Sequence, residues 1–419
     1  MLKPLLKACR WSMKKMMIMV FAIVLFSEMV FAARNLRQGA ISGFEFEGLK
    51  RTKETYLLKV LQKYIGASCD DETIAAIENE LREQGLFSSI TVQEIPSESN
   101  ADGATVKIVL KEKISFLVLP FGAFSNGGLM GGAAMLDQNA FGEKDTFLLG
   151  GMIAKDSYTV LSSFRKPSVD MTHPGFSISG TYSKQKTEID TLEGDELSKL
   201  EQHEVYAEAS LTEKFSTHFS GSVGINYTGN YFVDKSLDNI HIIAFHPTLK
   251  YEVSDWNGVF TSEKTFEVSG NIGCTTDGDF VTTQKIHASI QQPVISRLRL
   301  LIEACLSNQY NMPIIDQQTR SSVSNNLLPS NFHSPKMLSS NFGLELATVQ
   351  TKFAMLSVFG VYQVVIVKDY DETTDMSYGP GAGIRLYLST INLPAVGMGL
   401  YYNIPHEAFE FGVSMGVSF

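Results

Sequence analysis

Strict alternation of apolar and polar residues, repeated along the chain after residue 113, is the feature that most constrains its fold. Between Phe176 and Ser183, the side chains of Phe176, Ile178 and Tyr182 fall on one face of an expected strand and hydroxyl groups on the other. Gly and Ser fill the polar faces, and the apolar rows recur at intervals of about ten residues. One such strand would also suit a soluble sandwich, but the repetition favours a barrel wall that faces lipid.

The alternating segments predict about sixteen antiparallel strands, and a closed barrel of this kind needs an even number. They begin near Phe116, Leu129, Thr146, Tyr158, Gly175, Gln202, Thr217, Ile240, Lys264, Val281, Arg297, Lys336, Lys352, Met376, Ala395 and Glu407. In the last of them, Phe409, Phe411 and Val413 share one face, which is the expected lipid face. We therefore predict an all-β transmembrane barrel over residues 114–419.

The connections are expected to alternate between long outer loops and short inner turns. The long loops are expected at Thr187–Glu201, Asn230–Asn239, Met312–Pro335 and Lys368–Asp375. The short turns are expected at Gly142–Asp145, Glu213–Ser216 and Gln350–Thr351, with two longer exceptions at Lys166–Pro174 and Val253–Ser262. This asymmetry between the two ends is typical of transmembrane barrels.

Residues 41–113 mix periods of two and 3.6, which predicts a small α+β domain. A strand at Ile41–Glu47 precedes a helix within Thr52–Tyr64 and a second helix that Asp70 or Asp71 begins and Gly85 ends. The buried faces of these helices are expected to carry Leu57, Leu58, Leu61, Tyr64, Ile74, Ile77 and Leu81. Strands at Ile90–Ile95 and Thr105–Lys111 complete the order strand, helix, helix, strand, strand.

The N-terminal residues have the pattern of an export signal. Five basic residues precede an apolar run from Met16 to Phe26, and Ala32 supplies a small residue for cleavage, so we predict a signal peptide over residues 1–32. A membrane anchor is the alternative, but the run is shorter than the roughly twenty residues that span a bilayer. No second apolar stretch of about eighteen residues follows, so any later membrane crossing is expected to use strands.

The chain is acidic, with a formal net charge of -10, and residues 1–32 carry five basic residues and only one acidic residue. A mature chain without them is more acidic still, and it has no Lys/Arg cluster with interleaved aromatics, so no nucleic-acid partner is predicted. Cys69, Cys274 and Cys305 remain, odd in number and far apart. We expect buried or loop cysteines rather than a disulfide framework or a metal site.

No catalytic or cofactor-binding motif is predicted. His218-Phe219-Ser220 has the spacing of an outer-membrane phospholipase pair, but alternation places Phe219 on the lipid face and His218 and Ser220 in the lumen. Asp277-Gly278-Asp279 and the acidic stretch Glu188–Glu196 lack a full set of Ca²⁺ ligands and are expected to be solvated outer loops. We therefore predict no enzymatic activity, no cofactor and no metal site.

The two parts together resemble the superfamily of outer-membrane assembly factors, bacterial surface antigens and two-partner secretion transporters, in which periplasmic POTRA modules precede a sixteen-stranded barrel. In the small domain the resemblance rests on Gly43, Gly48, Gly66 and the stretch from Leu81 to Phe87. In the barrel it rests on Asn139-Ala140-Phe141-Gly142, on the lumenal motif from Gly381 through Gly383 to Arg385, and on the terminal Phe419, which the resemblance implies to be an assembly signal.

The chain departs from this superfamily in its sixth outer loop, Met312–Pro335. The superfamily usually has an Arg-Gly-aromatic motif there, whereas this loop has only Arg320, and its one aromatic residue, Phe332, has no Arg or Gly beside it. Phe359-Gly360-Val361 stands where the superfamily has an aromatic residue, one further residue and an Asp. We expect the loop to be anchored in a different way.

A barrel that opens sideways needs a weak place in its hydrogen-bond ladder. Pro120 in the first strand has no N–H to donate, and Gly412 and Gly416 weaken strand pairing in the last. We therefore predict a lateral seam formed by Phe116, Pro120, Gly122, Gly412 and Gly416. The alternative is that Pro120 lies in a harmless bulge near the periplasmic rim.

The resemblance implies a factor that assembles outer-membrane proteins through POTRA strand addition and the lateral seam. Its partners would be unfolded outer-membrane protein clients, membrane lipid and accessory lipoproteins. Its expected location is the outer membrane of a diderm bacterium, with the small domain in the periplasm. The alternatives are a two-partner-type secretion transporter and a passive pore.

Overall fold

The computed structural model describes residues 40–95, 104–125, 128–169, 173–192, 195–256, 259–329, 331–368, 373–388 and 396–415. The predicted signal peptide with Ala32, and the predicted site residues Gly416 and Phe419, lie outside these ranges. Among the described residues, no helix combines the length and the apolar character that a membrane crossing requires.

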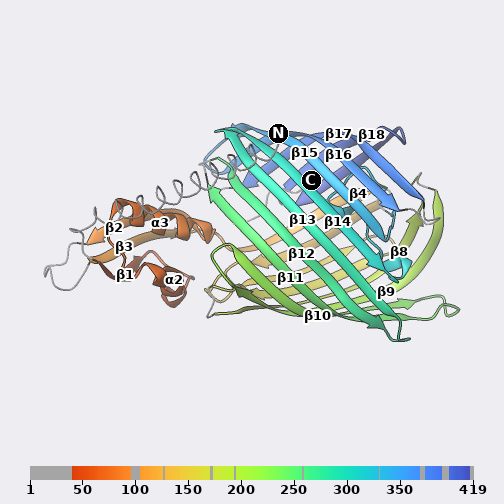
Figure 1. Ribbon diagram of the computed structural model, residues 1–419, viewed down its shortest axis with the longest axis horizontal. Helices are drawn as coiled ribbons and strands as arrows, with labels where there is room; N and C mark the ends of the chain where they lie inside the picture. The colour runs from red at the N-terminus through yellow and green to blue at the C-terminus, as the bar shows by residue number, and fades with distance from the viewer. Residues whose placement is uncertain are drawn as a thin grey trace, which may run out of the picture. The chain divides into compact units, whose positions relative to one another are not determined.

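The small domain consists of three strands and two α-helices, in the predicted order (Figure 1). The elements are β1 (Ile41–Glu47), α2 (Glu54–Leu61), the 3-10 turn η1 (Gln62–Tyr64), α3 (Asp71–Glu83), β2 (Phe87–Ile95) and β3 (Ala104–Glu112). The sheet order is β1-β3-β2, and β1 pairs with β3 in parallel. This order leaves β1 and β2 as the edge strands.

Short-range signals in the sequence set the ends of α3. The Oδ1 atom of Asp70 accepts a hydrogen bond of 2.8 Å from the N–H of Thr73, which makes Asp70 the N-cap. Gly85 follows the helix with a φ of 74°, a left-handed conformation that glycine adopts without strain. The predicted helix boundaries at these two residues are confirmed.

The core of the small domain contains most of the apolar residues that the helical spacing predicts. Its most deeply buried members are Ile41, Leu57, Leu61, Ile77, Leu81, Val106 and Ile108. Leu58 is an exception, because it is 39% exposed. It follows Leu57 directly in α2, and one residue turns a helix by roughly 100°, so both side chains cannot point to the same core.

The rest of the chain forms one antiparallel sheet of sixteen strands, which curls into a barrel (Figure 1). The strands are β4 (Phe116–Ser125), β5 (Gly128–Asp137), β6 (Thr146–Ile153), β7 (Tyr158–Lys166), β8 (Gly175–Asp190), β9 (Glu196–Lys214), β10 (Phe219–Phe232), β11 (Ile240–Trp256), β12 (Thr261–Thr275), β13 (Phe280–Ile295), β14 (Leu298–Tyr310), β15 (Lys336–Gln350), β16 (Ala354–Lys368), β17 (Thr374–Leu388), β18 (Val396–Asn403) and β19 (Ala408–Met415). Each pairs with its neighbours in sequence, so the predicted fold class and strand number are confirmed.

The first predicted outer loop, Thr187–Glu201, is wrong in its extent. Strands β8 and β9 continue their pairing to Asp190 and Glu196, so the connection is much shorter than predicted. This ribbon is charged, and ion pairs such as Lys184–Glu201 and Lys199–Glu188 join its residues. Charge indicated a solvated loop, but Ile189 and Leu192 near the end of the ribbon are buried, and Leu192 packs in a cluster with Phe332.

The longer inner turn predicted at Val253–Ser262 is also wrong in extent. Strand β11 continues to Trp256 and β12 begins at Thr261, with Val253 paired to Lys264. Phe260, just before β12, is 1% exposed. The connection therefore sends one aromatic side chain inward, rather than forming a wide loop.

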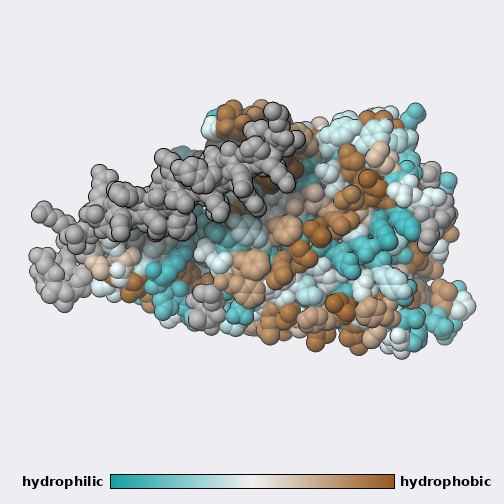
Figure 2. All heavy atoms as spheres, viewed as in Figure 1, coloured by the Kyte–Doolittle hydropathy of each residue, from teal (hydrophilic) through white to brown (hydrophobic). Residues whose placement is uncertain are grey.

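The two faces of the barrel wall differ as the alternation predicts. Phe176, Ile178, Phe411 and Val413 are exposed on the outer face. Figure 2 shows such apolar side chains gathered in patches over the strands of the barrel. Strands β14 to β16 carry polar residues on the buried inner face, among them Glu303, Asn341 and Gln363. A wall that is apolar outside and polar inside is typical of a barrel surrounded by lipid.

Candidate functional site

The connection between β14 and β15, residues 311–335, folds back onto the inner face of the barrel. It contains two 3-10 turns, η2 (Ile314–Asp316) and η3 (Arg320–Val323). Val323, Leu328 and Phe332 are fully buried and form a cluster with inward residues of the wall, namely Cys305, Met337, Val365 and Val367. This cluster makes the connection, called the lumenal loop below, an apolar plug inside a mostly polar lumen.

Polar contacts attach the lumenal loop to three strands of the wall. The hydroxyl of Ser339 on β15 donates to the carbonyl of Val323 over 2.6 Å. The backbone N–H of Asn326 donates to Oε1 of Gln363 on β16 over 3.1 Å, and Nδ2 of Asn403 on β18 donates to the carbonyl of Leu327 over 3.0 Å. These bonds satisfy backbone groups that water would otherwise have to reach, which favours one docked position.

The lumenal loop also binds the last strand of the barrel. Arg320 Nη1 lies 3.1 Å from Oε2 of Glu410 on β19 and donates to the carbonyl of Leu328. One inward position further along β19, a Cβ on Gly412 would lie 2.5 Å from Oδ1 of Asn326. Gly412 therefore provides room for the loop, a role that the prediction of a weakened strand did not include.

The predicted lumenal motif on β17 has a steric explanation. A Cβ on Gly381 would lie 2.2 Å from the ring of Tyr401. One on Gly383 would lie 2.1 Å from the carbonyl oxygen of Met398 and 2.6 Å from the ring of Phe359. Both rings are buried and belong to the cluster that Leu327 of the lumenal loop joins. The glycines of the motif thus let two aromatic rings lie flat against the wall beneath the loop.

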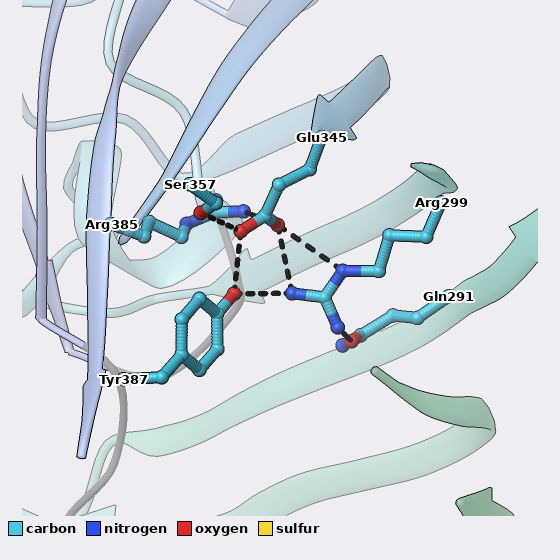
Figure 3. A network of polar contacts seen from close by, with 6 residues as sticks. All are labelled: Gln291, Arg299, Glu345, Ser357, Arg385 and Tyr387. Atoms are coloured by element: carbon cyan, nitrogen blue, oxygen red, sulfur yellow. Dashed lines mark hydrogen bonds and ion pairs between the residues drawn. The ribbon is translucent and has the colours of Figure 1, made fainter. Parts of the chain in front are cut away.

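Arg385, the last residue of that motif, belongs to a fully buried charge network (Figure 3). Its Nη1 lies 2.7 Å from Oε2 of Glu345, and Nη2 of Arg299 lies 2.8 Å from the same oxygen. The hydroxyl of Tyr387 donates to Oε1 of Glu345 over 2.6 Å, and Ser357 also donates to that oxygen. One carboxylate therefore joins four strands, β14 to β17.

Aromatic rings enclose both guanidinium groups of this network. The guanidinium of Arg299 lies 4.5 Å from the ring centroid of Phe260, and that of Arg385 lies 4.4 Å from that of Phe359. Phe260 also packs with Ala347 and Met355 at the short-turn end of the barrel. Cation–π contacts of this kind are stronger where water is excluded.

A polar cavity of about 520 Å³ lies between the lumenal loop and the inner face of the opposite strands, β8 to β14. Its lining includes Gln202, Glu204, Asn230, His246 and Asp316. His246 Nδ1 lies 3.2 Å from Oε1 of Glu208, and Nδ2 of Asn230 donates to both carboxylate oxygens of Asp316 over 3.0 and 2.9 Å. Burial raises the pKa of Asp316 to about 6.

The lipase alternative requires His218 and Ser220 to lie on one face of a strand, and the position of His218 does not meet this requirement. This residue lies in the turn before β10, and its ring centroid is 6.2 Å from that of Tyr251, an exposed residue paired with Phe219. The prediction that His218 shares a lumenal face with Ser220 is therefore wrong, since the alternation of β10 does not extend into the turn. In the described part of the chain, no three His, Cys, Asp or Glu side chains group as metal ligands.

The predicted seam residues lie on the two terminal strands of the sheet order, β4 and β19. Pro120 pairs in register with Ala133 and Gly122 with Gly131, and the register from Phe116 to Ser125 is continuous. Pro120 is therefore not in a bulge against β5. Gly412 pairs with Gly399 of β18. Weak pairing between β4 and β19 stays a prediction.

Sequence reasoning missed residues that join separate segments of the chain, above all Arg299, Glu345 and Asp316. In the sequence, Arg299 and Glu345 are charges at inward positions of apolar-rich strands. A charge at such a position must be paired to be tolerated, and this was the available signal. Asp316 offered no such signal, because it lies in a loop without periodicity.

Comparison with known proteins gives the same architecture. Residues 40–113 match the family model described as POTRA, surface antigen variable number repeat. No curated protein matches the chain in sequence.

Three solved structures have a similar fold at low sequence identity. BamA from Haemophilus ducreyi lacking POTRA domains 1-3 is 14% identical over 90% of this chain and 85% of that chain, with a TM-score of 0.52. CdiB from Acinetobacter baumannii is 11% identical over 90% and 73%, and CdiB from Escherichia coli is 10% identical over 92% and 91%, both with a TM-score of 0.59. The predicted combination of a POTRA module with a sixteen-stranded barrel is thus confirmed at the level of fold.

Proposed function

We propose that this protein assembles or inserts other proteins in the outer membrane, and that its last strand is the working element. The observation that carries the proposal is that the lumenal loop binds β19, a terminal strand of the sheet, at Glu410 and Gly412. A loop bound to that strand is placed to stabilise or release the seam between β19 and β4. Since the lateral route passes between strands, it does not require the lumen to be emptied.

The small domain would deliver clients by strand addition. Its edge strands β1 and β2 can extend the sheet through main-chain hydrogen bonds, with little dependence on the client sequence. An accessory lipoprotein could use the same edge. A chain with this fold that served only as a pore would have no use for such a domain.

A secretion transporter is the second candidate, and the similarity to the two CdiB structures supports it. Transport through the lumen would require the lumenal loop to leave, and with it the buried cluster around Phe332 and the bonds to three strands. A passive pore would require the same movement. We therefore rank both below lateral insertion.

The outward apolar wall and the predicted signal peptide support an outer-membrane location with the small domain in the periplasm. Aromatic residues gather on the outer face near both ends of the strands, with the contacts Phe164–Phe176 and Tyr182–His203 as examples. Such girdles mark the two interfaces of a membrane. We propose no covalent catalysis.

Depletion of the protein followed by an outer-membrane proteome tests this function. Broad loss of barrel proteins supports assembly. Loss of one secreted protein alone would favour the transporter, and altered solute uptake with a normal proteome would favour the pore.

Cross-linking across the seam tests the mechanism. Cysteines at Phe116 or Val118 of β4 would be combined with cysteines at Phe411 or Val413 of β19, in a chain without its natural cysteines. We expect a cross-linked seam to abolish client assembly. A matched control joins Ile225 and Phe245, outward neighbours on β10 and β11, and should leave assembly intact. Normal assembly with a fully cross-linked seam would refute lateral opening.

A further inference from the structure

Two carboxylates in the lumenal cavity have no ion-pair partner among the described residues. They are Glu204 on β9 and Asp316 in η2. The other charged side chains of the lining are paired elsewhere: Lys186 with Asp156, Glu188 with Lys199, and His246 with Glu208. Two acidic groups thus share a confined polar space without a compensating positive charge, which is costly unless a cation or a proton joins them.

Two buried amide groups in the same lining have oxygens without a hydrogen-bond partner in the described structure. These are Oδ1 of Asn230 and Oε1 of Gln202, and each residue is 1% exposed. Asn230 is the direct cross-strand neighbour of Glu204, and Gln202 lies two residues before Glu204 on the same face of β9. Buried polar atoms are rarely left without a partner, so these oxygens point to a missing one.

We propose that Glu204, Asp316, Asn230 and Gln202 form a binding site for a divalent cation, with Ca²⁺ as the ion that fits best. All four side chains offer oxygen, the ligand atom that Ca²⁺ prefers in carboxylates and amides. Ca²⁺ takes about six to eight oxygens in flexible geometry, and water in a cavity of about 520 Å³ can supply the rest. Mg²⁺ needs stricter octahedral geometry, so it fits this irregular set less well.

The ion would join the lumenal loop to the barrel wall. Glu204 and Gln202 belong to β9, Asn230 belongs to β10, and Asp316 belongs to the loop. The contact from Arg320 to Glu410 holds the loop to the last strand, on the other side of the sheet order. Ca²⁺ would therefore hold the lumenal loop to β9 and β10, and removal of the ion would release the loop from these two strands.

This site escapes motif analysis because its ligands come from three separate segments of the chain. Asp277-Gly278-Asp279, whose sequence indicates only an incomplete set of Ca²⁺ ligands, lies between β12 and β13 and serves here as the control.

Calorimetric titration of Ca²⁺ into the full-length protein in detergent, after treatment with a chelator, tests the site. We expect one saturable site with a dissociation constant on the order of 10⁻⁴ to 10⁻³ M, because only two ligands are charged. Asp316→Asn and Glu204→Gln should each weaken binding at least roughly tenfold. Asp277→Asn should leave the affinity unchanged.

The rate of trypsin cleavage after Arg320 is a second measurement. It reports how firmly the lumenal loop is docked, whereas calorimetry reports the heat of Ca²⁺ binding. Ca²⁺ should slow this cleavage in the unaltered protein and in Asp277→Asn, and it should have no effect in Asp316→Asn. A heat-modifiable band on gels shows that each variant is folded. The proposal is overturned if no Ca²⁺ binds at millimolar concentrations, if Asp316→Asn and Glu204→Gln bind it normally, or if only Asp277→Asn loses it.

Discussion

At the scale of single residues, glycines and one capping carboxylate show how small groups decide where larger parts can lie. Gly412, Gly381 and Gly383 leave room on the inner wall for side chains of the lumenal loop and for two aromatic rings. Gly360, on the outward face of β16, has nothing near the position of its missing Cβ. On the inner wall beneath the loop, glycine is therefore required by contacts with the loop and with the two rings.

Gly412→Val should displace the lumenal loop. The added side chain would overlap Asn326 and push the loop from β19, so trypsin should cleave after Arg320 several-fold faster. Gly360→Val, on the outward face of β16 where space is open, is the control and should not change the cleavage rate. Equal rates in both variants would mean that contact with Asn326 does not hold the loop.

Asp70→Ala should destabilise α3 by about 1 kcal/mol, the usual effect of losing an N-cap. Hydrogen bonds from Thr73 hold the pKa of Asp70 below its usual range, so its contribution is present above the pKa of the unfolded chain. It is lost as the pH falls through the lower folded pKa, in a window below about pH 4. Hydrogen exchange of residues 73–77, corrected for intrinsic rates, should show this loss in the unaltered protein, while Asp70→Asn, which keeps an acceptor, should show little pH dependence.

At the scale of elements, the network around Glu345 ties four consecutive strands at the short-turn end. Its charges are fully buried, so each depends on the others for compensation. Exposed pairs of the same barrel, such as Lys184–Glu201, remain hydrated and contribute little.

Glu345→Gln should destabilise the barrel by about 3 to 5 kcal/mol, because it leaves Arg299 and Arg385 buried without a counter-charge. Urea unfolding followed by the heat-modifiable gel shift measures this. Glu201→Gln is the control and should cost less than about 1 kcal/mol. A similar midpoint for both variants would show that the buried network is not needed for stability.

At the scale of the whole molecule, the position of the lumenal loop decides whether the lumen of the barrel is filled or open. It contacts strands from β10, through Asn230, to β19, through Glu410. Most of this attachment is apolar burial and backbone hydrogen bonding, so a single charge contributes only part of it.

Removal of residues 313–334 should raise the conductance of the protein in planar bilayers at least several-fold, and Arg320→Ala should increase brief openings without a permanent rise. The reason is that the deletion empties the lumen, whereas Arg320→Ala frees only the contact with β19. Lys199→Ala, at an exposed ion pair of β9, is the control. A deletion variant as silent as the unaltered protein would mean that other residues close the lumen.

The sequence alone determined the sixteen strands, their inward and outward faces and the order of the small domain, because these follow from periods of two and 3.6 along the chain. Charge was a weaker guide: it indicated a loop where β8 and β9 continue as paired strands. Tertiary structure decided that the loop after β14 fills the lumen, that Arg299, Glu345 and Arg385 meet, and that Glu204 and Asp316 share a cavity. The contacts of the loop and of the cavity join segments on different sides of the lumen, so they depend on the curvature of the sheet. The meeting of Arg299, Glu345 and Arg385 depends on the register of neighbouring strands rather than on local spacing.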